Sequence, residues 1–423
     1  MLDLNFIRQN PDKVRAAILA KREKADLDEL LRIDERRREL VAESEKLRSL
    51  RNERSKGIGK LKAQGKDTAE LMAGMKEVGD RIQAIEAELK GQEARLQECL
   101  ARIPNVPAED VPPGEDEKGN IEVRRWGEEP TFEFTPLPHW EIGKELGILD
   151  AEVSTKLSGP NFAYFHGLGA RLERALINFM LDLHTSQHGY TEVSPPAVVK
   201  SDCMFGTGQL PKLAEDMYRC KDDDLWLIPT AEVPVTNIHR DEILDAERLP
   251  IYYCAYTPCF RREAGSYGRE TRGLVRIHQF DKVEMVKFVK PGTSYDELEK
   301  LVGNAEAVLQ ALGLHYRVIK LCTGELSFAA TKCYDIELWA PGMKSWLEVS
   351  SCSNFEDFQA RRCGIRFKEK GGKPQFVHTL NGSGVALPRL MVALLETYQQ
   401  KDGSVVIPAP LRPYLRGVEV IRA

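Results

Sequence analysis

The chain lacks long apolar runs. No stretch of eighteen consecutive apolar side chains occurs in its 423 residues, so we predict no membrane-spanning helix. The opening segment, MLDLNFIRQNPDKVRAAILAKR, carries acidic residues early and has no apolar central region, which argues against a secretory signal or transit peptide. We therefore expect a cytoplasmic protein.

Cysteine spacing typical of metal sites is also missing. The nine cysteines include no CxxC pair. The pairs Cys254/Cys259 and Cys352/Cys363 have the wrong spacing for a zinc ribbon, and no histidine pair completes either set. We expect buried free thiols, no disulfides and no structural zinc.

The sequence has no GxxxxGK[ST] phosphate-binding loop, which excludes the P-loop route to a nucleotide. Its 42% hydrophobic and 30% charged residues describe a soluble globular protein of about two domains. The net charge of −5 argues only weakly against nucleic-acid binding, because that argument depends on where the charges lie.

Residues 27–103 have the pattern of a helical hairpin. Apolar residues recur at multiples of seven in its first half, at Ile33, Leu40, Leu47 and Leu61. In residues 71–103 they alternate steps of three and four, the seam of a coiled coil. We expect the chain to reverse within the glycine-containing stretch from Lys56 to Asp67, giving antiparallel arms of about 50 Å each.

Positive charge is concentrated in residues 46–66, where eight Lys and Arg stand against Glu53 alone, a net +7. The rest of the chain therefore carries −12, since the total is −5. A basic tip on a rigid rod favours contact with a phosphate backbone. A solvated helical face and a dimerising coiled coil are the alternatives. The candidate contacts are Arg48, Arg51, Arg54 and Lys56.

The helical pattern ends at Ile103-Pro104. The next segment, NVPAEDVPPGEDEKGN, is rich in proline, acid and glycine, which is a linker composition. We predict an N-terminal helical domain over 1–104, a linker over 105–120 and a second domain over 121–423.

A β-hairpin is predicted between residues 251 and 288, with strands Ile251–Phe260 and Leu274–Phe288 joined by a polar, glycine-containing loop. Period-two alternation places five side chains on one face of the second strand: Arg276, His278, Phe280, Lys282 and Glu284. That face suits a base stacked on the ring, a phosphate near an arginine, and an ammonium or hydroxyl near the carboxylate. The alternative is a solvated hairpin face.

Residues 260–280, FRREAGSYGRETRGLVRIHQF, resemble motif 2 of class II aminoacyl-tRNA synthetases, in the wording of the bacterial-type seryl-tRNA synthetase family. The resemblance implies that Arg261 binds the α-phosphate of ATP, that Glu263 lies near the adenine and ribose, and that adenine stacks on Phe280. It adds Arg262 and Arg276 to the ATP-binding residues.

Thr230-Ala231-Glu232 is similar to the TAE element of that family, whose residues contact the amino group of serine. As an alternative, Thr230 caps a helix and Glu232 lies in its first turn, and both can hold together. The resemblance further implies that Glu284 and Ser383 meet the serine hydroxyl.

The strand pattern WLEVSSCS, residues 346–353, carries one carboxylate among small polar side chains. By resemblance, Glu348 and Ser351 hold a divalent cation, expected to be Mg²⁺, and Val349 and Ser350 complete this part of the ATP site. Strict alternation would place Glu348 and Ser351 on opposite faces, so the strand must end or bulge between them.

Thr379–Gly384 precedes a helix pattern that begins at Val385 and carries Arg389 in its first turn. A cation beside the positive end of a helix makes an anion site, although a structural arginine is the alternative. The segment resembles motif 3, whose arginine binds the γ-phosphate. Residues 168–196, a helix and strand followed by Pro195-Pro196, resemble motif 1, which implies a homodimer.

The resemblance spans nearly the whole chain. It predicts an α+β fold, the class II antiparallel sheet flanked by helices, with an N-terminal coiled-coil arm that contacts serine tRNA. It predicts a ligase that forms seryl-adenylate from L-serine and ATP and transfers serine to the tRNA 3′ end, with Arg261, Glu263 and Arg389 as catalytic residues. The HIGH and KMSKS elements of class I synthetases are absent.

Two other functions remain open at this point. A related ligase that loads a carrier protein is expected to lack the long arm. A catalytically inactive paralogue that serves as a binding module is expected to have lost motif residues. This sequence retains Arg261, Glu263, Glu284, Glu348 and Arg389.

Overall fold

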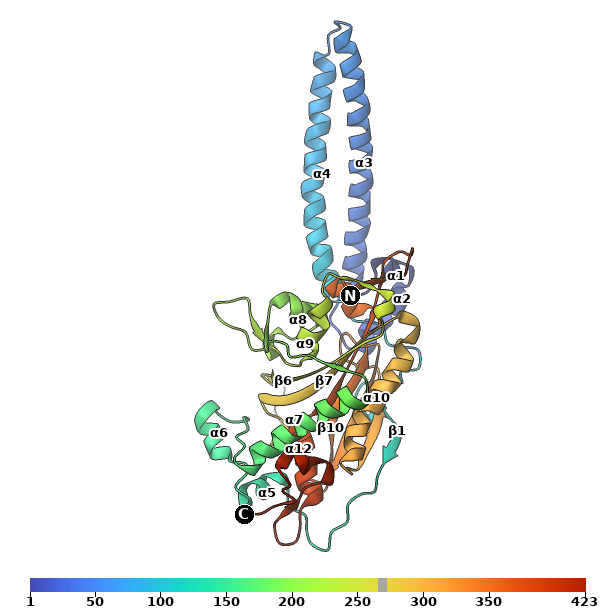
Figure 1. The fold of residues 1–423 in the computed structure, drawn as a ribbon. Helices are drawn as coiled ribbons and strands as arrows, with labels where there is room; N and C mark the ends of the chain where they lie inside the picture. Colours follow the sequence, from blue (N-terminus) through green and yellow to red (C-terminus); the bar gives the residue numbers. More distant parts are fainter. Residues whose placement is uncertain (265–271) are drawn as a thin grey trace. The chain divides into compact units, whose positions relative to one another are not determined.

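The computed structural model describes residues 1–264 and 272–423; residues 265–271, the tip of the predicted hairpin loop, lie outside them (Figure 1). The chain forms two compact units. The first is Leu2–Ile103, and the second is Met1 together with Pro104–Ala423. Among the described helices, none combines the length and apolar character that a membrane span requires.

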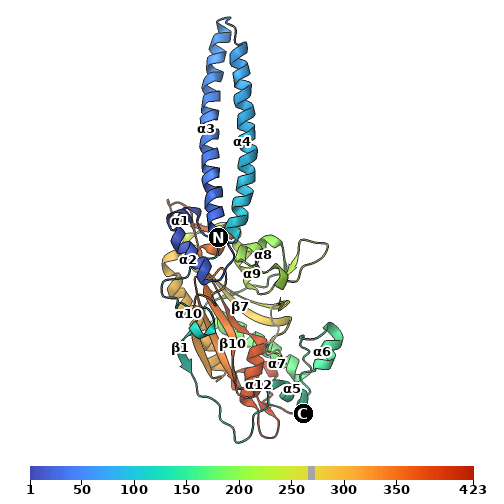
Figure 2. The same cartoon turned by 180° about the vertical axis from the view of Figure 1, so that it is seen from behind.

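The first unit is helical. Two short helices, α1 (Leu4–Gln9) and α2 (Pro11–Ala20), precede two long ones, α3 (Leu27–Ala63) and α4 (Ala69–Ala101). The carboxylate of Asp26 accepts a hydrogen bond from the Glu29 amide and so caps the start of α3. Helices α3 and α4 run antiparallel along each other (Figures 1 and 2), which confirms the predicted hairpin.

The hairpin is held mainly by its apolar seam. Residues buried along it include Leu30, Ile33 and Leu40 of α3 and Ile82, Ile85 and Leu96 of α4. Ion pairs cross between the helices at Arg36–Glu88 (2.9 Å), Arg48–Glu86 (2.7 Å) and Arg81–Glu43 (2.7 Å). These pairs are exposed, so each contributes at most about 1 kcal/mol.

The chain reverses later than the first glycines of the predicted stretch. Gly57 and Gly59 lie inside α3, and the turn is made around Gly65, whose φ is +70°. A left-handed residue after a helix is what glycine supports without a Cβ penalty. The neighbours of Gly57 and Gly59 are mostly good helix formers such as lysine and leucine, which offset the cost of about 1 kcal/mol for each internal glycine.

The second unit is built on an eight-stranded sheet, in the order β1-β8-β9-β10-β13-β7-β6-β2. Neighbours are antiparallel except β2 and β6. The strands are β1 (Ile121–Trp126), β8 (Tyr316–Lys320), β9 (Lys332–Ala340), β10 (Ser345–Asn354), β13 (His378–Ala386), β7 (Gln279–Val289), β6 (Ile251–Phe260) and β2 (Thr191–Glu192).

Helices pack on both faces of this sheet. On one face lie α7 (Leu168–Gln187), α10 (Ser294–Ala311) and α12 (Leu387–Tyr398); α7 and α12 begin close to the helices predicted from residue 168 and from Val385. Strand β7 sends Val283 and Met285 into that layer. It sends Val286 and Phe288 to the other face, where α9 (Glu232–Thr236) and α11 (Phe358–Cys363) pack. The α+β class is confirmed.

Smaller elements complete the second unit. Its remaining helices are α5 (His139–Glu145), α6 (Ala151–Ser158) and α8 (Ser201–Thr207). Its minor strands are β3 (Val198–Val199), β4 (Trp226–Leu227), β5 (Ile243–Asp245), β11 (Arg366–Lys368), β12 (Gln375–Phe376), β14 (Val405–Val406) and β15 (Val420–Ile421).

The second strand of the predicted hairpin was placed too early. It begins at Gln279, not at Leu274. In the sequence Val275 and Ile277 continue the apolar alternation of Val283 and Met285, but the buried residues are Leu274 and Ile277, three apart, and the backbone there bonds to other groups. The Leu274 amide donates to His139, and the Val275 carbonyl accepts from Arg389. Arg276 therefore does not share a strand face with Phe280, Lys282 and Glu284.

Residues 105–120, predicted as a linker, are fastened within the second unit. The Asn105 side-chain amide donates to the carbonyls of Ala329 and Phe355, each at 2.9 Å. Farther along, Asp110 pairs with Lys332 at 2.6 Å. All nine cysteines lie in described segments and are free thiols, as predicted; three of them, Cys99, Cys203 and Cys220, are only half-buried.

Candidate functional site

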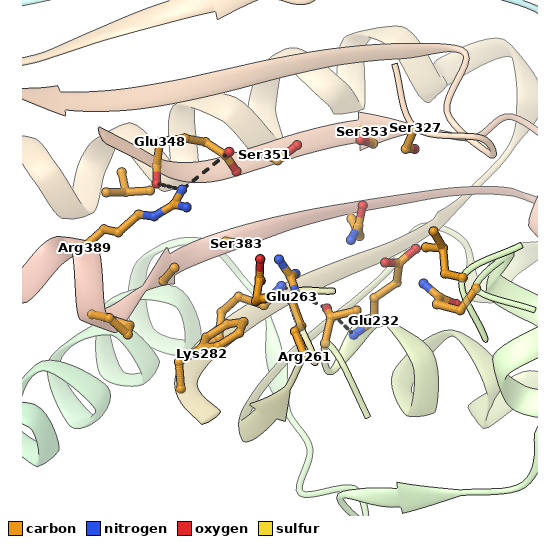
Figure 3. Close-up of a pocket in the computed structure, with 18 of the residues that line it drawn as sticks. Glu232, Arg261, Glu263, Lys282, Ser327, Glu348, Ser351, Ser353, Ser383 and Arg389 are labelled. Atoms are coloured by element: carbon orange, nitrogen blue, oxygen red, sulfur yellow. Dashed lines mark hydrogen bonds and ion pairs between the residues drawn. The ribbon is translucent and has the colours of Figure 1, made fainter. Parts of the chain in front are cut away.

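A cleft of about 440 Å³ opens on the sheet where β7, β10 and β13 lie side by side (Figure 3). Its volume falls within the range of sites for small molecules. Predicted site residues that line it are Thr230, Glu232, Arg261, Glu263, Arg276, Phe280, Glu348, Val349, Ser351, Ser383 and Arg389. One end is rich in arginine, and the other is a buried polar cluster.

Strand pairing assembles the polar cluster. In β7, Phe280, Lys282 and Glu284 alternate onto one face. Strand β13 lies beside it with Ser383 directly opposite Glu284. The pairing of β7 with β13 thus brings motif 2 side chains next to motif 3 side chains from a hundred residues later.

Glu284 is only 1% exposed, and both of its oxygens are engaged. Oε2 accepts from the Thr230 hydroxyl at 3.1 Å and pairs with the Lys282 ammonium, while Oε1 accepts from the Asn381 amide at 2.9 Å. A carboxylate oxygen has two lone pairs. Oε1 therefore keeps room for one further donor, whereas Oε2 does not.

The Thr230 hydroxyl is fully used by the protein. It donates to Glu284 and accepts from the Lys282 ammonium at 2.9 Å and from the Glu232 amide at 3.2 Å. Glu232 lies in the first turn of α9 as the capping alternative expected, but the N-cap is Ala231, so the Thr230 hydroxyl accepts from the residue just before the cap position. Ala231 is fully buried in the core behind the cleft. Only backbone groups of Thr230 and Ala231 therefore remain to meet a ligand.

Glu232 forms the wall of the cluster. Its Oε1 accepts from the Gln359 side-chain amide at 2.6 Å. Burial raises the pKa of Glu232 to about 7, and the negative charge of Glu284 acts in the same direction. The hydrogen bond from Gln359 and the charges of Lys282 and Arg261 act against that rise. A ligand cation placed here would favour the ionised carboxylate.

At the other end, Arg261 and Arg276 approach the cleft from the two arms of the motif 2 loop. The Arg261 guanidinium lies over the Phe280 ring at 5.1 Å, and its Nε donates to the Pro229 carbonyl at 3.3 Å. Arg276 pairs with Glu263 at 2.6 Å. Glu263 has a φ of +51°, a left-handed conformation that a non-glycine residue rarely adopts.

Arg389 comes from the first turn of α12. Its Nε donates to the Val275 carbonyl at 3.1 Å, and Nη1 donates to the Glu348 carbonyl at 2.7 Å and lies 3.5 Å from the Glu348 carboxylate. Figure 3 shows its guanidinium directed toward Glu348 across the cleft. A quarter of this side chain is exposed, so it is accessible to a ligand.

Strand β10 bulges at the predicted place. Its register against β9 shifts between Glu348 and Ser350, so Val349 is the extra residue. The bulge allows Glu348 and Ser351 both to line the cleft. Ser350 points elsewhere, with its hydroxyl donating to the Ser383 carbonyl at 2.6 Å.

Arg262 is not brought to the cleft in the part of the chain that is described. Its guanidinium lies 6.0 Å from the Tyr218 ring, and its backbone amide donates to the Asp216 carbonyl. Direct contact of its side chain with a ligand in the cleft would require a rearrangement.

The predicted nucleic-acid contacts all lie on α3. Arg48, Arg51, Arg54 and Lys56 are exposed. The Arg48 charge is already paired with Glu86 of α4. Arg54 lies close to Gly74, which leaves space for its guanidinium against α4. Arg51 and Lys56 therefore offer the more accessible charges.

Comparisons with known proteins decide the family. Residues 1–107 match the seryl-tRNA synthetase N-terminal domain, and residues 218–398 match the class II tRNA synthetase core domain for G, H, P, S and T. The chain is 60% identical to the serine–tRNA ligase of Caldanaerobacter subterraneus subsp. tengcongensis, covering 100% of this chain and 99% of that one. The chain belongs to the seryl-tRNA synthetases.

Solved structures agree. The seryl-tRNA synthetase of Pyrococcus horikoshii complexed with ATP superposes with a TM-score of 0.94 at 37% identity, over 100% of this chain and 99% of that chain. The cytoplasmic serine–tRNA ligase of Naegleria fowleri in complex with AMP gives 0.89 at 28% identity, with the same coverage of both chains. This seryl-tRNA synthetase is therefore a class II aminoacyl-tRNA ligase.

Several residues of this synthetase site were missed from sequence. Lys282 was placed on the correct face but given no role, and Asn381 could have been found, because period two places it on the face of Ser383. Gln359 could not, because nothing in its helix pattern indicates that it reaches Glu232. Other lining residues lie in irregular loops without periodicity: Gln209, Ser327 and Phe328.

The cleft of this synthetase also suits the Mg²⁺ that its family implies. Mg²⁺ prefers oxygen ligands and is usually held by one or two carboxylates together with substrate phosphates. The bulge puts the Glu348 carboxylate and the Ser351 hydroxyl on the same wall. Asp335 of β9 stands opposite Ser351 in the ladder, but it does not line the cleft and burial raises its pKa well above the usual range, so the set offered to the ion is Glu348 and Ser351 with the substrate phosphates.

Proposed function

We propose that the cleft binds L-serine at its buried polar cluster and ATP at its arginine-rich end, and joins them as seryl-adenylate. The carboxylate of serine attacks the α-phosphorus, the bond to the β-phosphate oxygen breaks, and pyrophosphate leaves. The observation that carries the proposal is the buried set of Glu284, Lys282 and Thr230 directly beside Arg261. No protein nucleophile is needed.

Serine recognition falls to two carboxylates. Glu232 faces the ammonium, and Glu284 Oε1, the oxygen with a remaining lone pair, accepts from the hydroxyl, with Ser383 beside it. Thr230 and Ala231 contribute backbone groups, and the Thr230 side chain orients Glu284. A small cluster with both oxygens of Glu284 already oriented suits a short side chain that ends in a donor.

ATP recognition falls to the positive end. Arg261 binds the α-phosphate, Arg276 and Glu263 hold the ribose side, and Phe280 stacks on adenine. Arg389 binds the γ-phosphate and stabilises the charge that builds on the leaving pyrophosphate. Val349 and Ser350 follow Glu348 in the bulge of β10 and position the Glu348 side chain on the wall of the cleft. ATP and AMP in the two similar solved structures support a nucleotide in this cleft.

Mg²⁺ would be held by Glu348 and Ser351, and when bound it supplies positive charge to the phosphate oxygens. The 3.5 Å contact between Arg389 and Glu348 orients that carboxylate before the ion arrives.

The remaining assignments concern partners and place. The first unit binds serine tRNA through Arg48, Arg51, Arg54 and Lys56, and the seryl group passes to the 3′-terminal ribose of that tRNA. Two copies form a homodimer through α7 and β2, and the protein acts in the cytoplasm. A role in loading a carrier protein is disfavoured by the N-terminal match over residues 1–107.

The test is ATP–pyrophosphate exchange with each of the twenty amino acids. Serine should support exchange far better than any other amino acid, because the other side chains either lack the donor for Glu284 or exceed the cluster in volume. Equal exchange with alanine would contradict serine as the substrate.

In that assay the KM for serine should rise as the pH falls below about 7. The pKa of Glu232 is raised to about 7, so its carboxylate is progressively protonated below that value and loses its attraction for the ammonium. The rise approaches tenfold per pH unit for a single group. Glu232→Gln should raise the KM most above pH 7, where the wild-type carboxylate is ionised, and so flatten the profile. An unchanged KM between pH 8 and pH 6 would remove Glu232 from this role.

Replacing Arg51, Arg54 and Lys56 by alanine should weaken tRNA binding without changing serine-dependent exchange. Each lost phosphate contact lowers the slope of log K against log salt by about 0.7–0.9, so the slope should fall by up to about 2–3 units. Binding is measured from 50 to 300 mM salt. The matched control removes three other exposed cations of the same unit, Lys24, Arg32 and Lys90. Equal losses in both triple variants would show a general charge effect and no specific surface.

A further inference from the structure

His139 and Glu396 form a buried pair outside the cleft. Both side chains are fully buried, and they lie where α5 packs on α12 (Figures 1 and 2). Glu396 Oε1 accepts from the His139 amide at 2.9 Å and lies 3.0 Å from the His139 ring Nδ1. Its Oε2 accepts from the amides of Gly342 and Met343. Four N–H groups thus occupy both oxygens and hold the carboxylate in one orientation.

The other ring nitrogen of His139 faces the motif 2 loop. The Leu274 amide donates to Nε2 at 3.0 Å. Because Nε2 accepts, the proton of the neutral ring is on Nδ1, which donates to Glu396. The contacts therefore define one tautomer of the His139 ring. They also form a chain of two hydrogen bonds, named here the relay, that runs from the Leu274 amide through His139 to Glu396.

The segment that receives this contact is residues 272–276, named here the return arm. It is gripped closely at its start. A Cβ at Gly273, whose φ is +71°, would lie 2.2 Å from His139 Nε2. The Arg272 guanidinium lies over the Trp140 ring at 4.7 Å. Two successive residues of α5 thus hold the arm.

The return arm then enters the cleft. The Val275 carbonyl accepts from Arg389, and Arg276 pairs with Glu263. A shift of Leu274 therefore moves two things together: the Val275 carbonyl, which accepts from Arg389, and the Arg276 side chain. Thr230, Glu232 and Glu284 lie on other segments, and their hydrogen bonds go to one another and to neighbouring side chains of the polar cluster.

We propose that His139 is a positioning residue for the nucleotide half of the site: oriented by Glu396, it fixes the return arm through the Leu274 amide, and the arm sets Arg276 and Arg389 for ATP. The inference rests on the proposed function for its kinetic consequence. The hydrogen bond itself can be tested without it.

Two substitutions separate the halves of the relay. In His139→Gln, the side-chain oxygen reaches the place of Nε2 and keeps an acceptor for the Leu274 amide. In His139→Asn, the shorter amide keeps a donor for Glu396 but loses Leu274. We expect His139→Asn to raise the KM for ATP about tenfold and to lower kcat/KM for ATP about 10²-fold, with the KM for serine unchanged. His139→Gln should stay within about threefold of the wild type.

A purely structural role predicts a different order. If the pair only stabilises α5 against α12, the variant that keeps the Glu396 contact, His139→Asn, should be at least as active as His139→Gln. The thermal midpoint of each variant is measured alongside. If neither variant folds, Gly273→Ala displaces the same contact from the arm side and should produce the same defect confined to ATP. A normal KM for ATP in a folded His139→Asn or Gly273→Ala variant would overturn the proposal.

Coupling and hydrogen exchange complete the test. Adding His139→Asn to Arg276→Ala should cost much less than it does alone, because both act through one segment; full additivity would contradict the relay. The Leu274 amide should exchange slowly in the wild type and in His139→Gln and faster in His139→Asn. If the wild type shows no serine-dependent pyrophosphate exchange, the proposed function fails. The hydrogen-exchange rate of the Leu274 amide in the three proteins still tests whether His139 holds the return arm.

Discussion

Arg389→Ala should lower the rate of serine-dependent pyrophosphate exchange by about 10²–10³-fold while leaving the fold intact. A charge contact made to a group that gains negative charge in the transition state is worth about 3–4 kcal/mol in a pre-organised site. In the structure Arg389 already bonds Val275 and Glu348, so its guanidinium is fixed before ATP binds. The measurement is kcat for exchange at saturating serine and ATP.

The matched control is Arg412→Ala. Arg412 makes the same kind of contacts, an Nε bond to the Ile407 carbonyl at 3.0 Å and an ion pair with Glu419 at 2.9 Å, but it lies outside the cleft. It should leave exchange unchanged. Arg389→Lys should recover only part of the loss, because an ammonium lacks the planar fork that meets two oxygens. Near-normal exchange in a folded Arg389→Ala variant would make Arg389 a structural arginine.

Local periodicity was sufficient to predict much of the site. Phe280, Lys282 and Glu284 share a face because β7 is a regular strand over their span. The bulge at Val349 was predicted by combining strand alternation with the family resemblance, which implies that Glu348 and Ser351 face the same side. The first inference depends only on alternation, and the second also needs the resemblance.

The errors arise where distant segments replace local partners. Arg276 was placed on a strand because Val275 and Ile277 continue the apolar alternation of Val283 and Met285 in β7. The Leu274 amide instead bonds to His139, and that partner lies 135 residues away in sequence. A period-two pattern reports burial, not the identity of the hydrogen-bond partner, so a buried loop can imitate a strand.

The same limit affects the role of Thr230. The sequence indicates a residue near the substrate ammonium, and the structure shows a hydroxyl saturated by Glu284, Lys282 and the Glu232 amide. Three segments must meet before that saturation exists. Roles that depend on counting lone pairs therefore follow only from the assembled cluster.

Glu284→Gln should remove most of the preference for serine over alanine. In the wild type, alanine leaves Glu284 Oε1 with an unfilled site and buries a carboxylate that has lost a partner, so discrimination of about 10⁴ is expected. The substituted glutamine keeps the shape of the side chain but loses the charge that attracts Lys282 and the substrate hydroxyl. We expect kcat/KM for serine to fall about 10³-fold, with the KM for ATP changed less than about threefold.

Glutamine is preferred to alanine as the replacement because Glu284 is paired with buried Lys282. Removing one partner of a buried ion pair costs about 3–5 kcal/mol, so Glu284→Ala combines a loss of stability with a loss of recognition. The control is Glu306→Gln, which removes a buried carboxylate paired with Arg124, whereas the partners of Glu284 are Thr230, Lys282 and Asn381, which line the cleft. It should reduce the thermal midpoint without changing selectivity.

Threonine distinguishes selection through the substrate hydroxyl from selection by side-chain volume. It retains the hydroxyl, so the wild type must exclude it by volume, which is worth only about 1–3 kcal/mol per added methyl. Glu284→Gln should therefore lower exchange with serine and threonine by similar factors and leave exchange with alanine nearly unchanged. If serine keeps its full advantage over alanine in a folded Glu284→Gln variant, Glu284 is not the partner of the hydroxyl. Ser383, directly across the ladder, then becomes the residue to replace.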